Sequence, residues 1–77
     1  MRFEYDEVAS ALYVYLEDKP YAYGTDLDHE RRIDYAADGT PIGLELSCVR
    51  SGVNVDSLPS GPEIVKILRE LDIPLYA

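Results

Sequence analysis

The densest group of polar side chains is the run Asp26-Leu27-Asp28-His29-Glu30. Asp26, Asp28 and Glu30 alternate along the chain, so their carboxylates could offer hard oxygen ligands to a divalent cation. His29 could act as a base, because the histidine side chain titrates near neutral pH. These three carboxylates are therefore the candidate metal ligands, and a metal-dependent enzyme is one hypothesis for the function.

The same run also fits a solvated hairpin end, and this interpretation is favoured. Arg31 and Arg32 follow directly and lie close enough to neutralise the carboxylates. An EF-hand calcium loop needs a central glycine and a terminal glutamate at fixed positions, and this segment lacks both. We therefore expect no metal and no cofactor.

No other group of residues predicts catalysis. Cys48 is the only cysteine, which excludes an internal disulfide framework and a cysteine-rich zinc site. It follows Leu46 in an apolar run, so we expect it to be buried as a small apolar residue rather than to act as a nucleophile. The serines show no nucleophile-elbow pattern. The sequence predicts a protein that is not an enzyme.

The tyrosines are more informative, since the chain has seven of them and no tryptophan. Residues 11–16 predict a strand with Leu12 and Val14 on one face and Tyr13 and Tyr15 on the other. Because tyrosine combines a large apolar ring with a polar tip, Tyr13 and Tyr15 are candidate interface residues. The alternative is that they are partly exposed and pair across strands of the chain's own sheet.

Composition and charge narrow the function classes. The chain has 77 residues, enough for a single domain over 1–77, and its 47% hydrophobic and 29% charged content is typical of a globular protein. Its net charge of −8 argues against a nucleic-acid partner, which would need clustered basic residues. Neither a membrane span nor a signal peptide is apparent, so we expect a cytoplasmic protein. Residues 1–47 hold eleven acidic and four basic groups, a sum of −7, which would steer a basic partner.

An antiparallel sheet is predicted for residues 2–47. The expected strands begin at Phe3, Ala11, Tyr21, Arg32 and Ile42, and they are separated by turn-forming residues. Gly24 marks a bulge or a close backbone approach within the third strand. Asp38-Gly39 is typical of a hairpin turn, and an even-numbered loop would keep Ile33 and Leu44 on the same face.

The C-terminal third predicts a helix over residues 60–72. Ser60 and Glu63 have the spacing of a capping box, and apolar residues recur at helical spacing from Ile64 to Leu71. A short terminal strand is expected within residues 73–77. The predicted class is α+β: a small antiparallel β-meander of about five strands packed against one C-terminal helix.

Several of these elements together resemble a known family. Tyr5-Asp6, Ala11-Leu12-Tyr13-Val14, Asp34-Tyr35, Asp38-Gly39 and Gly43-Leu44-Glu45 are similar to the small prokaryotic proteins grouped as domain of unknown function family 2283. The resemblance covers residues 2 to 49, and the helix after it resembles an extension that some members carry. It implies a small antiparallel sheet packed with helix and no established reaction or catalytic residues. Some members sit beside small toxin-like proteins, which implies an antitoxin or partner-binding role.

Three functions follow as hypotheses. The leading one is a non-enzymatic interaction module that self-associates as a homodimer through its sheet, because a small core often needs a partner. The second is an antitoxin-like partner of a small basic toxin. The third is the metal-dependent enzyme described above.

Overall fold

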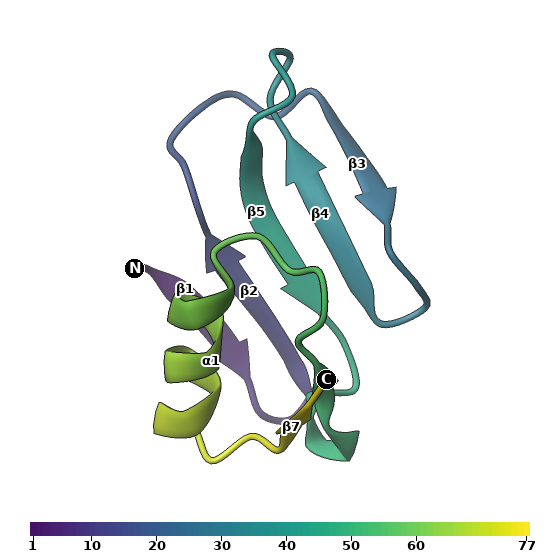
Figure 1. Cartoon of the computed structure of the whole chain (residues 1–77), viewed down its shortest axis with the longest axis vertical. Helices are drawn as coiled ribbons and strands as arrows, with labels where there is room; N and C mark the ends of the chain where they lie inside the picture. Colours follow the sequence, from purple (N-terminus) through teal and green to yellow (C-terminus); the bar gives the residue numbers. More distant parts are fainter.

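Alternating apolar and polar side chains favour the strands that form within the first 47 residues. The computed structural model describes all 77 residues of the chain (Figure 1). The main sheet consists of β1 (Phe3–Asp6), β2 (Ala11–Tyr15), β3 (Tyr23–Asp26), β4 (Arg31–Tyr35) and β5 (Pro41–Leu46). The rest contains a 3-10 turn η1 (Val49–Ser51), β6 (Val53–Asn54), α1 (Gly61–Glu70) and β7 (Leu75–Tyr76). The five-stranded antiparallel sheet with one helix confirms the predicted α+β class.

The strand order is β1-β2-β5-β4-β3, so the simple meander expected from the sequence is wrong. Strands β3 to β5 do form a meander, but β5 then inserts between β4 and β2. This places Leu44 opposite Val14 and Leu46 opposite Leu12 at the centre of the sheet. Strand β3 is mostly exposed and polar, which suits an edge strand. In a simple meander β3 would pair with β2, and β2 would then lack an apolar neighbour on that side.

The β4–β5 hairpin keeps the expected register by a different route. Its loop covers residues 36–40, so the prediction of an even-numbered loop is wrong. The pairing shifts between Asp34 and Tyr35, which leaves Ile42 as an extra residue in β5. This bulge compensates for the odd loop, and Ile33 lies opposite Leu44 as the apolar pattern requires.

The core lies between α1 and one face of the sheet. Ile64, Ile67 and Leu68 of α1 are buried, as their helical spacing predicts. They belong to one cluster with Leu12, Val14, Ile33, Leu44 and Leu46 of the sheet and with Val49, Val53 and Ile73 of the C-terminal segment. Burying an aliphatic side chain of this size stabilises the fold by about 1.5–3 kcal/mol relative to its exposed state.

The start of α1 differs from the predicted capping box. Ser60 has a left-handed backbone (φ 54°), and its side chain makes no capping hydrogen bond. A side-chain cap normally requires an extended backbone at this position, so the observed conformation explains why the hydroxyl does not cap the helix. The helix begins at Gly61, and Pro62 lies in the first turn, where no backbone N–H is needed.

The helix ends two residues earlier than expected, at Glu70. Asp72 has φ 56°, and its N–H bonds to the carbonyl of Arg69 at 3.2 Å. The N–H of Ile73 bonds to the carbonyl of Leu68 at 2.9 Å, which completes a Schellman motif. The chain then forms the short terminal strand β7, which pairs in parallel with β6.

Candidate interaction surface

One face of the sheet packs against α1, and the other is left uncovered. We call the uncovered surface the open face. Cross-strand pairing places Glu4, Tyr13, Glu45, Arg32 and Asp26 in one row across all five strands, and Tyr15, Gly43, Asp34 and Gly24 in the next. With the flanking residues, the open face consists of Arg2, Glu4, Asp6, Ala11, Tyr13, Tyr15, Gly24, Asp26, Arg32, Asp34, Gly43 and Glu45. The predicted placement of both tyrosines opposite Leu12 and Val14 is confirmed.

A glycine on the central strand gives Tyr13 its position. The Tyr13 side chain lies across Gly43, where an added Cβ would overlap the tyrosine hydroxyl. From there the hydroxyl donates a 2.8 Å hydrogen bond to Asp34 on β4. Burial and this bond to a carboxylate raise the pKa of Tyr13 well above its usual range, since both oppose loss of the proton.

A second glycine positions Arg32 in the same way. A Cβ at Gly24 would lie within 2.7 Å of the guanidinium carbon of Arg32. The bulge or close backbone approach expected at Gly24 is absent, because β3 pairs regularly with β4 and the group that approaches Gly24 is the Arg32 side chain. Arg32 Nη1 bonds to Asp26 at 3.0 Å, and Arg32 Nε lies 3.5 Å from Asp34. The two glycines thus let a tyrosine and an arginine lie flat on the sheet and share Asp34.

Tyr15 lies at the edge of this network. Its ring meets the ring of Tyr13 edge-on, with centroids 4.9 Å apart and planes at 72°. Its hydroxyl donates a 2.9 Å hydrogen bond to Glu4, which raises the pKa of Tyr15. The guanidinium carbon of Arg2 lies 3.7 Å from the centre of the ring, in cation–π geometry.

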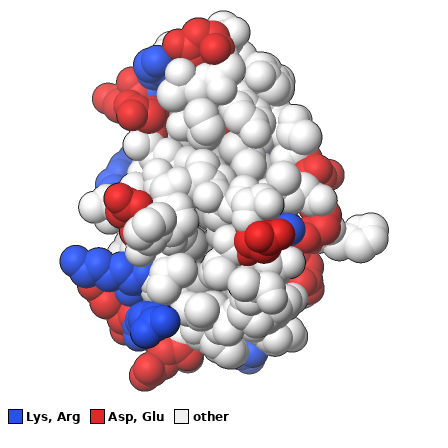
Figure 2. Space-filling view, in the orientation of Figure 1, with Lys and Arg blue, Asp and Glu red and all other residues white.

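The charge of the open face is unbalanced. It carries five carboxylates and two guanidinium groups, a net charge of −3. Glu45, near its centre, is exposed and forms no ion pair. The opposite side of the molecule, seen from α1, is mostly uncharged across its centre, with acidic and basic groups mixed toward its rim (Figure 2).

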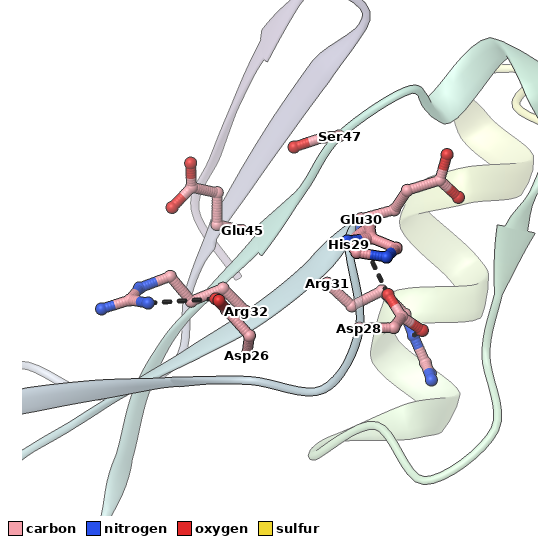
Figure 3. A pocket seen from close by; sticks show the side chains of 8 residues that line it. All are labelled: Asp26, Asp28, His29, Glu30, Arg31, Arg32, Glu45 and Ser47. Atoms are coloured by element: carbon pink, nitrogen blue, oxygen red, sulfur yellow. Dashed lines mark hydrogen bonds and ion pairs between the residues drawn. The ribbon is translucent and has the colours of Figure 1, made fainter.

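The three candidate metal ligands do not form one cluster. They line a polar hollow of about 490 Å³ beside the 26–32 hairpin, yet no group of three metal-ligating side chains lies close enough to hold an ion. Asp26 pairs with Arg32, whereas Asp28 lies with His29 and Glu30 on the other side of the hollow (Figure 3). In this hollow, carboxylates therefore lie beside arginines rather than around a shared metal position.

Asp28 serves a structural role in this hairpin. Its carboxylate accepts the N–H of Glu30 at 2.9 Å and a 2.8 Å bond from Arg31, and these interactions hold the pKa of Asp28 below its usual range. The Arg31 side chain, only 11% exposed, also donates to the carbonyls of Asn54 and Asp56 at 3.0 and 2.6 Å. This anchor was missed from the sequence, although Arg31 alternates with Ile33 on the core-facing side of its strand.

Cys48 is exposed, so the prediction that it is buried is wrong. The backbone leaves the sheet at this residue in a left-handed conformation (φ 53°), and the next residue, Val49, takes the buried position. The apolar run had suggested burial, but the strand ends at Leu46 and the alternation ends with it.

A one-sided antiparallel sheet with a C-terminal helix defines the class of this protein as a small α+β domain. The family model described as "Protein of unknown function (DUF2283)" matches residues 2–47, and the chain belongs to that family. The match covers the whole main sheet, which confirms the resemblance found in the sequence. No curated protein and no solved structure matches the chain. No helix of the structure has the length and apolar character needed to cross a membrane.

Proposed function

We propose that this protein is a non-enzymatic interaction module that binds another protein on its open face. The observation that carries the proposal is the one-sided covering of the sheet. The helix packs on the apolar face, while Tyr13, Tyr15 and Arg32 lie on a face that no other element covers. Tyrosine and arginine are enriched at the centres of protein interfaces, because they bury a large area and keep a polar group for hydrogen bonding.

Two side chains of this face, Tyr13 and Arg32, are held in place in the free protein. Tyr13 is held by Asp34, and Arg32 is held by Asp26, each within hydrogen-bond distance. Binding to such a surface orders few additional side chains, so less conformational entropy is lost on association. The small loss of conformational entropy favours the open face as an interaction surface.

The partner that fits best is a basic protein. The open face has a net charge of −3 and the chain a net charge of −8, so a basic partner would be attracted from a distance and would associate faster. A small basic toxin is one partner of this kind, so an antitoxin-like role is a specific form of this proposal. The exposed carboxylate of Glu45 is the group on this face most available to a partner's cation.

The size of the face favours a reversible complex. Five strands about 4.8 Å apart and about five residues long give a footprint of roughly 400 Å². That is below the roughly 800 Å² per partner of a standard interface, so the complex should be weak unless neighbouring loops join in.

Self-association through the same face is the competing proposal. Two copies would bring two surfaces of net charge −3 together, and like charges facing one another oppose association. We therefore rank a basic partner above the homodimer expected from the sequence.

Photo-crosslinking in the cells that make the protein tests the proposal. A photoreactive amino acid replaces Glu45 on the open face or, as a matched control, Glu70 on the exposed side of α1. We expect position 45, but not position 70, to yield one discrete adduct whose other component is a basic protein. A second copy of the chain in the adduct would favour the homodimer instead, and equal adducts from both positions would contradict the proposal.

A further inference from the structure

We infer that Tyr15 and the residues that follow it form a binding site for the guanidinium group of a partner's arginine, and that Arg2 holds this site in the free protein. The inference rests on the proposed function, since it states where a basic partner inserts one side chain. It concerns the end of β2 rather than the centre of the open face.

A hollow lies at this end of the strand. It has a volume of about 390 Å³ and is lined by Arg2, Tyr15, Leu16, Glu17 and Asp18. An aromatic ring, an aliphatic side chain and two carboxylates therefore border one space. This combination suits a planar cation, which can stack on the ring and donate hydrogen bonds to the acids.

The charges around the hollow are not neutralised within the chain. Glu17 and Asp18 form no ion pair. The next residue, Lys19, lies 2.9 Å from Asp38 and 3.1 Å from Thr40, so it is engaged by the neighbouring hairpin. Both carboxylates thus remain available to an incoming cation.

Arg2 shows which cation the ring accepts. Its guanidinium carbon is 3.7 Å from the centre of the Tyr15 ring, and it forms no ion pair with any carboxylate. It is an exposed residue just before β1, held at its side chain by the ring. A partner's arginine that reaches both the ring and the carboxylates would gain ion pairs that Arg2 lacks and would displace it.

The probe for this site is N-acetyl-L-arginine amide, titrated into the full chain. NMR follows the Tyr15 ring signals and, in every variant including Tyr15→Leu, the backbone amide signals of Glu17 and Asp18. Arg2→Ala should bind it about threefold more tightly than the unmodified protein, because the site is no longer occupied by a competing group. Lys66→Ala removes the same charge from α1 and should leave the affinity unchanged. Adding Tyr15→Leu to Arg2→Ala should abolish saturable binding, whereas Tyr76→Leu should not.

Three results would overturn the inference. They are no saturable shift of the Tyr15 ring in Arg2→Ala, equal gains from Arg2→Ala and Lys66→Ala, or binding that survives Tyr15→Leu. The lysine analogue should bind more weakly, since an ammonium cannot stack on the ring as a plane. Position 45, which is used for crosslinking, lies on β5, whereas Tyr15 lies on β2. Failure at the Tyr15 site and failure of the proposed function are therefore separate results.

Discussion

Tyr13 and Asp34 lie on strands that are not neighbours, yet a 2.8 Å hydrogen bond joins them. The tyrosine crosses the intervening strand above Gly43, whose missing side chain leaves room for the phenol ring. One hydrogen bond thereby ties β2 to β4 across β5. The open face owes its fixed shape to this arrangement and to its counterpart at Gly24.

Gly43→Ala should lower the free energy of unfolding by about 1–3 kcal/mol, because the new Cβ displaces the Tyr13 ring and breaks its bond to Asp34. Chemical denaturation measures the change. In a Tyr13→Ala background the same substitution should cost much less, since the ring is gone. Gly61→Ala is the control, because a Cβ there meets nothing within 4 Å. Equal losses at both glycines would contradict the account.

Tyr13 and Tyr15 should ionise above the usual pKa of a tyrosine as the pH rises. The pKa of Tyr13 is raised in the folded state, so its contribution to stability is complete below its unfolded pKa of about 10 and is lost as the pH climbs toward the folded value. Absorbance at the phenolate band should show two delayed tyrosines in the unmodified protein and one in Tyr13→Phe. An unchanged delayed step in Tyr13→Phe would refute this assignment.

Asp28→Asn should reduce the stability at neutral pH and flatten its dependence on acid. The folded-state pKa of Asp28 is lowered by the N–H of Glu30 and by Arg31, so its contribution is present above the unfolded pKa of about 3.9 and is lost as the pH falls through the folded value. Urea denaturation between pH 2 and neutrality gives the two curves. They should converge at low pH, and parallel curves would show that Asp28 is not the titrating group.

Arg31→Met should lower the free energy of unfolding by about 2 kcal/mol, because it leaves Asp28 and two backbone carbonyls without their charged donor. The local loss of stability should be largest around β6, where the N–H of Val55 bonds to the carbonyl of Tyr76 at 2.8 Å. Hydrogen exchange at Val55 should therefore accelerate more than at Leu44 in the central strand. Arg69→Met, an exposed residue of α1, should change neither quantity.

The parts of the fold that could be predicted are those with a strong local pattern. Alternation identified the strands and the two faces of β2, and helical spacing identified Ile64, Ile67 and Leu68 as core residues. The position of β5 between β2 and β4 could not be predicted, because strand order depends on which apolar surfaces meet rather than on any one segment. The bulge at Ile42 was missed for the same reason, since a pairing shift shows only when both strands are in place.

The surface was predicted in outline. The sequence identified Tyr13 and Tyr15 and the excess of negative charge, but not the roles of Gly43 and Arg32. Gly43 lies diagonally from Tyr13 on the neighbouring strand, and Arg32 lies diagonally from Gly24. These contacts therefore depend on the observed strand order and register. Sequence reasoning also gathered Asp26, Asp28 and Glu30 into one candidate site, whereas Arg31 and Arg32 draw the first two carboxylates to different sides of the hairpin.

The most direct test of the open face is a matched charge reversal against the partner found by crosslinking. Glu45→Lys and Glu70→Lys change the net charge equally, one on the open face and the other on α1. The account predicts that Glu45→Lys raises the Kd about tenfold at low salt and less at high salt, while Glu70→Lys has little effect. Equal Kd values for the two variants would contradict the claim that the open face is the binding surface.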